Sequence, residues 1–207
     1  IVLHINIIKG KGFDLAETNK EPWHYHGPFS LEEQDNNSQP SESYASITSD
    51  FLLEEMKQDE KVVVVTPGVP GSFGFDQSKR KQAGKQFVDV GIAEQQATSM
   101  VTGFAQNGAK PVLISSVTFM QRAVDQISHD MCLNNVPATI LLNGGSLNAF
   151  RDATHLGIFG ISMFSHIPNL VLLAPTNVEE YLSMLKYSIH QTKYPVMILL
   201  PGNGLVY

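Results

Sequence analysis

A carboxylate at the start of a predicted helix is the first side chain in this sequence that is placed for acid–base chemistry. Glu94 follows the apolar run 87–90, which predicts a short strand, and it opens a stretch that predicts a helix over 94–106. A carboxylate near a helix N-terminus is stabilised by the helix dipole, and this alone could account for Glu94. A ligand lying beyond the end of the strand could also meet this carboxylate.

A second group of candidate residues follows the next predicted strand, 110–115. Phe119 comes just past the end of that strand, where its ring can stack on a ligand ring. Arg122 and Asp125 are about one helical turn apart, so they could simply pair with each other on the helix surface. The group therefore predicts either a ring-binding site or an ordinary helix face.

Two histidines complete the candidates. His155 follows a long loop after the predicted strand 138–142, and His26 lies in the aromatic and imidazole-rich tract 23–27. Imidazole titrates near neutral pH, which suits it to proton transfer. A loop histidine can equally well be structural, so the residue type alone does not decide between the two roles.

Other kinds of site are excluded by missing motifs and by composition. The spacing of Gly68, Gly71 and Gly74 does not fit a dinucleotide-binding loop, and the sequence has no Walker, H-E-x-x-H, C-x-x-C or G-x-S-x-G motif. A net charge of −6 argues against binding to nucleic acid. The single Cys132 excludes an intrachain disulfide framework, and we expect it to be a reduced core residue. No apolar run approaches the roughly 20 residues that a membrane span needs.

The elements that position the candidates alternate between strands and helices. Apolar runs predict strands over 61–66, 87–90, 110–115, 138–142, 169–174 and 196–200. Helices are predicted over 43–58, 94–106, 119–133 and 178–190, with a short helix after His155. Such alternation is typical of an α/β domain with a parallel sheet covered on both faces, and ligands of such sheets bind at the carboxyl ends of the strands.

The N-terminal part of the chain has a different composition. Residues 1–8 predict a strand, whereas 13–42 are polar and irregular and predict a linker. Because the chain opens on this strand without a Met, we expect it to be a piece of a longer protein. Charged residues make up only 16% of the sequence, which favours a surface covered by a partner.

Taken together, these tracts resemble one family. Residues 89–97 read D-V-G-I-A-E-Q-Q-A, 118–126 read T-F-M-Q-R-A-V-D-Q, and 152–157 read D-A-T-H-L-G. They are similar to the motifs D-V-A-I-A-E-Q-H-A, T-F-L-Q-R-A-Y-D-Q and D-G-x-T-H-x-G of the 1-deoxy-D-xylulose-5-phosphate synthases, within the transketolase group. The chain resembles their central, pyrimidine-binding domain over essentially its whole length, with 1–12 similar to the tail of the preceding diphosphate-binding domain.

The resemblance implies a three-layer α/β/α domain over 43–207 that holds the aminopyrimidine of thiamine diphosphate. Glu94 then matches the glutamate that bonds ring nitrogen N1′, and Phe119 matches the aromatic residue that stacks on the ring. Arg122 and Asp125 match helix positions that order the site, while His155 and His26 match catalytic histidines that face the substrate. The diphosphate and Mg²⁺ are held by the preceding domain in the family, so this chain alone is expected to be inactive.

The resemblance also implies a cytoplasmic homodimer that acts on a small 2-oxo acid or sugar and binds neither nucleic acid nor membrane. Four departures bear on the substrate. Gly144 and Leu199 stand where the family has arginines that bind the substrate phosphate, Gln96 replaces a histidine, and Ser116 replaces a tyrosine.

Three interpretations therefore stay open. The first is a thiamine-dependent transferase with altered acceptor specificity. The second is a catalytically degenerate paralogue that acts as a binding or assembly partner. The third is a genuine 1-deoxy-D-xylulose-5-phosphate synthase.

Overall fold

Six parallel strands form one sheet in the order β2-β1-β3-β4-β6-β5 within the described part of the chain. The computed structural model describes residues 1–24, 42–145, 153–202 and 204–207, which fall into two units, Ile1–Ser41 and Glu42–Tyr207. The strands all belong to the second unit, and their bounds are β1 (Val62–Thr66), β2 (Phe87–Asp89), β3 (Lys110–Ser116), β4 (Thr139–Asn143), β5 (Val171–Leu173) and β6 (Val196–Leu199). The predicted parallel α/β sheet is confirmed.

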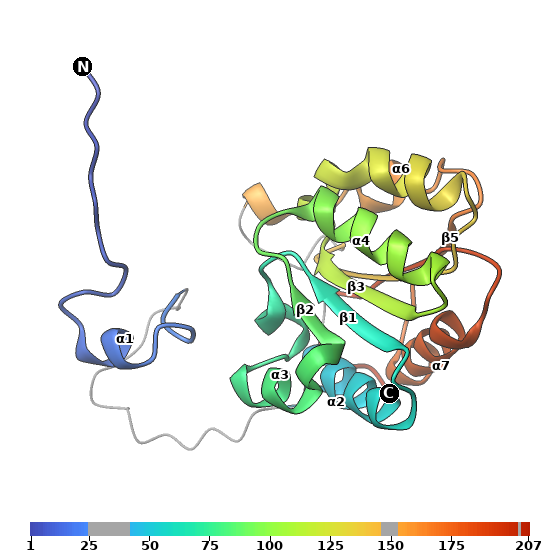
Figure 1. Ribbon diagram of the computed structural model, residues 1–207, viewed down its shortest axis with the longest axis horizontal. Coiled ribbons are helices and arrows are strands. Elements are labelled where there is room, and N and C mark those ends of the chain that lie inside the picture. The colour runs from blue at the N-terminus through green and yellow to red at the C-terminus, as the bar shows by residue number, and fades with distance from the viewer. Residues whose placement is uncertain (25–41, 146–152, 203) are drawn as a thin grey trace. The chain divides into compact units, whose positions relative to one another are not determined.

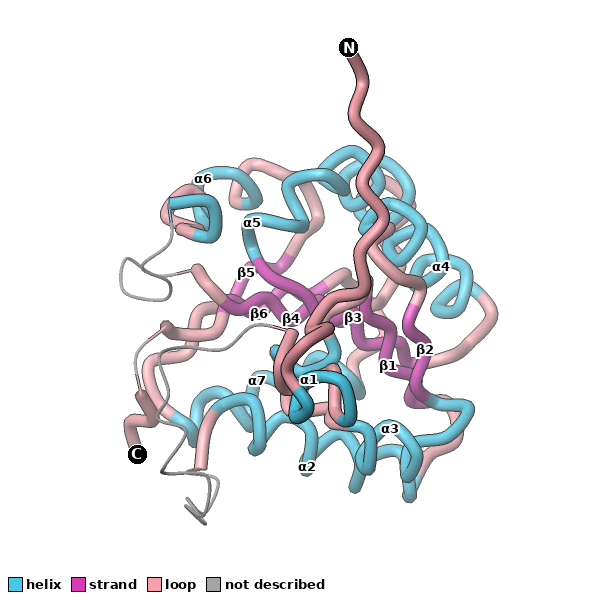
Figure 2. The backbone as a smooth tube through the Cα atoms, turned by 90° about the vertical axis from the view of Figure 1, so that its left-hand side faces the viewer, coloured by secondary structure: helices cyan, strands magenta, loops and turns pink. Residues whose placement is uncertain are grey.

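Helices cover both faces of the sheet, which gives the three-layer architecture (Figure 1, Figure 2). One face carries α2 (Tyr44–Gln58), α3 (Gln77–Ala83) and α7 (Val178–His190). The other carries α4 (Glu94–Gln106), α5 (Val117–Met120), the π-helix η4 (Gln126–Cys132) and α6 (Gly160–Phe164). Among the described residues, no helix is both long and apolar enough to cross a membrane.

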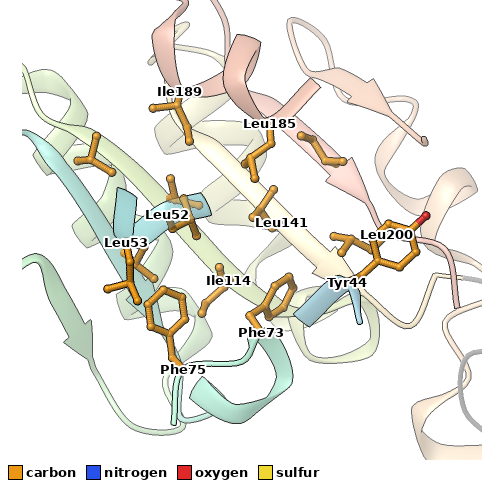
Figure 3. Packing of buried hydrophobic residues seen from close by; sticks show 14 of the residues in the cluster. Tyr44, Leu52, Leu53, Phe73, Phe75, Ile114, Leu141, Leu185, Ile189 and Leu200 are labelled. Carbon is orange, nitrogen blue, oxygen red and sulfur yellow. The ribbon is translucent and has the colours of Figure 1, made fainter. Parts of the chain in front are cut away.

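Two apolar cores hold the helices on the sheet. On the face of α2, the side chains of Leu52 and Leu53 pack towards Ile114 and Leu141 of the central strands (Figure 3). Leu52, Ile114 and Leu141 are fully buried. Burial of each such side chain contributes about 1.5–3 kcal/mol, so the central strands form a rigid base for the loops at their ends.

Helix caps explain why the long helices begin where the sequence predicts. Ser43 and Ser46 form a reciprocal capping box at the start of α2, and the Asn177 side chain accepts a hydrogen bond of 2.8 Å from the Glu180 amide at the start of α7. Such caps satisfy amides that have no partner within the helix. The predicted helices 43–58 and 178–190 agree with the capped helices α2 and α7 within one residue, and the predicted helix 94–106 agrees with α4, which has no side-chain cap.

The predicted helix 119–133 is wrong as a single element. The chain instead forms α5, a 3₁₀ turn η3 (Gln121–Ala123) and the π-helix η4. Its apolar residues still face the core, because Met120, Ala123 and Ile127 are all buried. Apolar spacing alone cannot distinguish these closely related helical forms, and π turns often mark functional sites.

Smaller elements were also missed. The segment after the predicted strand 61–66 contains the 3₁₀ helix η1 (Pro70–Phe73), and α3 follows it, capped by the Asp76 side chain. Of the residues in α3, only Ala83 is buried, so the sequence lacks the regular spacing of apolar residues that would predict this helix. The short helix expected after His155 is α6, and the 3₁₀ turn η5 (Ala153–His155), which was not expected, ends at His155 itself.

The N-terminal unit differs from its prediction as well. Residues 1–8 form neither helix nor strand, and the Ile1, Val2 and Leu3 side chains are exposed. The backbone N–H and C=O groups of a strand need hydrogen-bond partners on a neighbouring strand. An apolar sequence alone does not provide that neighbour. Helix α1 (Asp14–Thr18) forms within the predicted linker, and Phe13 packs edge-to-face on Trp23 with ring centroids 4.9 Å apart.

Cys132 should be nearly unreactive in the folded protein. It is a fully buried free cysteine, and burial raises the pKa of its thiol to about 12. Because the thiolate is the reactive form, alkylation by iodoacetamide at pH 8 should be at least about a hundredfold slower than in urea. Mass spectrometry of the Cys132 peptide over time measures both rates, and native alkylation within about tenfold of the unfolded rate would contradict this core packing.

Candidate functional site at the carboxyl edge of the sheet

Glu94, Phe119 and His155 each follow the carboxyl end of a strand, near the point where the direction of the chain changes across the sheet. The chain passes from β1 outward to β2 and then returns through α4 to β3 on the other side of β1. The loops after β1 and β3 therefore leave towards opposite faces. Such a switch point at the carboxyl ends of parallel strands is the usual place for a ligand.

Glu94 is a buried carboxylate at this edge. It is the first residue of α4, and its side chain is only 4% exposed. Within the described parts of the chain its carboxylate has one charged partner, Arg122, whose Nη1 lies 3.7 Å from Oε2. That separation is too long for a strong hydrogen bond, and Arg122 is 62% exposed. Burial of a carboxylate is costly unless it is well paired, so the fold maintains Glu94 here against a desolvation cost.

Arg122 thus binds a different partner from the one its spacing suggests. It lies in η3 and reaches back to Glu94, and no ion pair joins it to Asp125 among the described residues. Asp125 is exposed, and its carboxylate accepts only a long contact of 3.5 Å from Gln126. The structure therefore brings Glu94 and Arg122 together and leaves Asp125 outside this pair.

Phe119 and His155 form the second contact of the site. Their ring centroids are 5.4 Å apart and their planes are nearly perpendicular. The His155 Nδ1 also lies 2.8 Å from the Thr154 hydroxyl. Both rings are partly exposed, so an aromatic face and an imidazole lie side by side where a ligand can reach them.

The loop that carries His155 is held by close packing at Gly157. A Cβ atom on Gly157 would overlap the Gly144 carbonyl oxygen and lie 2.9 Å from the Val117 Cβ. Only glycine allows this approach, which ties the loop to the end of β4 and to α5. The position of His155 next to Phe119 depends on it.

Buried polar atoms around Phe119 were missed by the sequence analysis. Within the described residues, Ser115 Oγ, Thr118 Oγ1 and Gln126 Oε1 are buried without a hydrogen-bond partner. Buried polar groups are nearly always paired, so the unpaired hydroxyls of Ser115 and Thr118 mark the junction of β3 and α5 as a place where polar partners are missing. The hydroxyl residues that end the otherwise apolar strand β3 were the available signal.

The two positions at which the family resemblance implies arginines lie close together. A Cβ on Gly145, which follows Gly144, would lie 3.6 Å from the Leu199 Cβ. Leu199 is 4% exposed and packs in the core on the α4 side of the sheet. The neighbouring Ser116 donates a 2.7 Å hydrogen bond to Asn143, so this corner carries no positive charge among these residues.

Other residues and features considered as functional do not contribute to this edge of the sheet in the described part of the chain. His26 lies outside the described residues, as does Asp152 of the 152–157 motif. The described residues contain no group of three or more His, Cys, Asp or Glu side chains suited to a metal ion. A cavity of about 350 Å³ lies at the opposite edge of the sheet, lined by Lys61, Lys110 and others, and it contains none of the candidate residues.

Comparison with known proteins decides the family. Residues 42–205 match the model of the transketolase pyrimidine-binding domain. The chain belongs to this family. It is 37% identical over 204 residues to 1-deoxy-D-xylulose-5-phosphate synthase from Clostridium beijerinckii, covering 99% of this chain and 33% of that protein. It is also 37% identical over 191 residues to 1-deoxy-D-xylulose-5-phosphate synthase 1 from Geobacter sulfurreducens, covering 91% of this chain and 30% of that protein.

Solved structures share the family fold. A transketolase from Pichia stipitis in complex with sedoheptulose 7-phosphate superimposes with a TM-score of 0.70 at 17% identity, over 80% of this chain and 26% of that one. A split-gene transketolase described as an inactive β4 tetramer superimposes with a TM-score of 0.66 at 21% identity, over 80% of this chain and 53% of that one. The chain spans about a third of the length of the curated synthases it matches. The expected family and the three-layer fold are confirmed.

Proposed function

We propose that this chain binds the aminopyrimidine ring of thiamine diphosphate within a transferase that resembles 1-deoxy-D-xylulose-5-phosphate synthase. The observation that carries the proposal is the buried Glu94 carboxylate, which has one long contact, to Arg122, among the described residues. A carboxyl group kept from water at the edge of a sheet can exchange a proton with a ring nitrogen of a ligand. Family membership makes the aminopyrimidine the ring to expect.

The residues present fit such a ring. Phe119 offers a partly exposed aromatic face, and the hydroxyl of the adjacent Thr118 is a buried polar atom with no hydrogen-bond partner among the described residues. A flat heteroaromatic ring needs both an apolar face and polar partners at its edge. Arg122 would keep the Glu94 carboxylate oriented without pairing it fully.

Each candidate then has a defined role in proton transfer or binding. When bound, thiamine diphosphate supplies the nucleophilic carbon for transfer of a ketone or aldehyde group. Glu94 holds the proton shared with ring nitrogen N1′, and Phe119 stacks on the ring. Asp125 orders the helix beside the site. His155, held against Phe119, exchanges protons with the substrate, and His26 is assigned the same task from the family resemblance.

The diphosphate half of the site belongs to another domain in this proposal. Residues 1–12 would form the tail of that domain, 13–42 the linker, and 43–207 the pyrimidine-binding domain. The exposed apolar side chains of residues 1–8 support this, since no strand pairs with these residues within the described part of the chain. Mg²⁺ would bind with the diphosphate, so the isolated chain would show no turnover. The complete enzyme would be a cytoplasmic homodimer.

The acceptor of the transferred group is proposed to differ from that of the synthases. Gly144 and Leu199 offer no charge where the family has phosphate-binding arginines, and Leu199 is a core residue. A phosphate dianion needs charge-assisted donors, best supplied by guanidinium groups. Retention of Glu94 and Phe119 favours a working enzyme over a degenerate binding partner, and loss of both arginines favours altered specificity over a genuine synthase.

Glu94→Gln tests the acid–base role in the complete enzyme, which joins this chain to a diphosphate-binding domain. The amide keeps the shape but cannot exchange a proton, so deuterium exchange at C2 of bound thiamine diphosphate should slow by at least about a hundredfold. Cofactor affinity should change far less. Glu179→Gln, which makes the same change in the first turn of α7, is the matched control. Exchange in Glu94→Gln at the wild-type rate would contradict the proposal.

Substrate choice tests the altered acceptor site. Two lost charge-assisted contacts of about 1.5–3 kcal/mol each correspond to roughly a hundred- to ten-thousand-fold in affinity. The enzyme should therefore prefer glyceraldehyde 3-phosphate over glyceraldehyde by less than about a hundredfold in kcat/KM. Restoring an arginine at Leu199 is a poor test, because it would bury a charge in the core. A preference above about a hundredfold would favour the genuine-synthase alternative.

A further inference from the structure

We infer that Asp89 is a positioning residue that holds the Glu94 carboxylate in place by bridging two loops. The inference rests on the proposed role of Glu94, and it concerns a side chain five positions earlier in the sequence. Asp89 is the last residue of β2, and the short link 90–93 joins it to the start of α4. The position of Glu94 depends on how this link is held.

A single oxygen of Asp89 makes the bridge. Its Oδ1 accepts a hydrogen bond of 3.0 Å from the Gly68 amide and one of 2.9 Å from the Gly91 amide. Gly68 lies in the loop after β1, whereas Gly91 lies in the link itself. The carboxylate therefore ties the link to the neighbouring loop, and hydrogen bonds to a charged acceptor are the stronger kind.

The backbone on both sides is shaped for this bridge. Gly68 and Gly91 have φ angles of +80° and +70°, in the left-handed region that glycine adopts at little cost. A Cβ on Gly68 would lie 3.3 Å from the Ile92 side chain, so the two loops are in close contact. The paired amides point at one acceptor because both residues adopt this conformation.

Few other contacts hold the link. Among the described residues, Asp89 is the only side chain that hydrogen-bonds to residues 90–93, and the backbone adds Val90 N to Thr66 O at 3.0 Å. Ala93 provides no side-chain cap for α4. Strand β2 is a three-residue edge strand that pairs only with β1. Without Asp89, residues 90–93 would keep one hydrogen bond to the sheet, from Val90 N to Thr66 O, while Ala97 and Val101 still pack α4 on the core.

The effect on chemistry follows from distance. Glu94 must meet a ring atom at hydrogen-bonding range, and a misplacement of about 1 Å can cost roughly a hundredfold in rate. Asp89 itself does not need to touch the ligand. Its removal should therefore loosen the link and slow proton transfer at Glu94 together.

The experiment compares Asp89→Ala, Asp89→Asn and Asp76→Ala in the complete enzyme. Asp76 is the matched control. Its carboxylate also accepts a hydrogen bond from a backbone amide, that of Lys79 at 2.8 Å, but it caps α3 on the other face of the sheet. Backbone hydrogen exchange at Gly68 and Gly91 is measured without cofactor, and deuterium exchange at C2 is measured with thiamine diphosphate bound.

Asp89→Ala should speed amide exchange at Gly68 and Gly91 by at least about tenfold and slow C2 exchange by at least about tenfold. Asp89→Asn should stay within about threefold of wild type in both, because its amide oxygen can still accept both bonds. Asp76→Ala should leave both readouts unchanged. Should Asp89→Ala fail to fold, Asp89→Ser takes its place, since the shorter side chain cannot bridge both amides.

A double-mutant cycle with Glu94→Gln separates positioning from general destabilisation. If Asp89 acts through Glu94, then adding Asp89→Ala to Glu94→Gln should slow C2 exchange no further. The same slowing in both backgrounds, or no slowing in Asp89→Ala alone, overturns the inference. Wild-type C2 exchange in Glu94→Gln would instead overturn the proposed function and, with it, this role of Asp89.

Discussion

The burial of one carboxylate at the start of α4 is the constraint on which the site depends. Glu94 is almost completely shielded from solvent, and Arg122 approaches it only to 3.7 Å. A group in this state carries a desolvation cost that the rest of the fold must offset. In the proposed function, the same shielding would let a ring nitrogen of the ligand become the close partner of the Glu94 carboxyl group.

The sheet provides the stability that this cost requires and fixes the geometry around Glu94. Strands β1 and β3 are buried on both faces, and their carboxyl ends carry the loop that contains Gly68 and the helix α5 that contains Phe119. Close contacts at two glycines, Gly68 against Ile92 and Gly157 against Gly144, hold neighbouring loops together. The site is thus assembled from segments at the strand ends that close packing and the hydrogen bonds of Asp89 hold together.

Much of this arrangement could be predicted from the sequence, and the remainder depends on long-range contacts. The alternation of predicted strands and helices located α2, α4 and α7 within one residue, and the stretch that begins at Glu94 was predicted to open a helix. The partner of Arg122 could not be read from spacing, because Glu94 is 28 positions away from it whereas Asp125 is three. The strand expected over 1–8 failed for a related reason, since a strand forms only where another strand pairs with it.

The most direct measurement of the central claim compares two cofactor analogues in the complete enzyme, one with carbon in place of ring nitrogen N1′ and one with carbon in place of N3′. Deuterium exchange at C2 is measured for each in wild type and in Glu94→Gln. The account predicts that the N1′ analogue exchanges at least about a hundredfold slower than thiamine diphosphate in wild type, with no further loss in Glu94→Gln. Exchange of the N1′ analogue at the rate of thiamine diphosphate itself would contradict it.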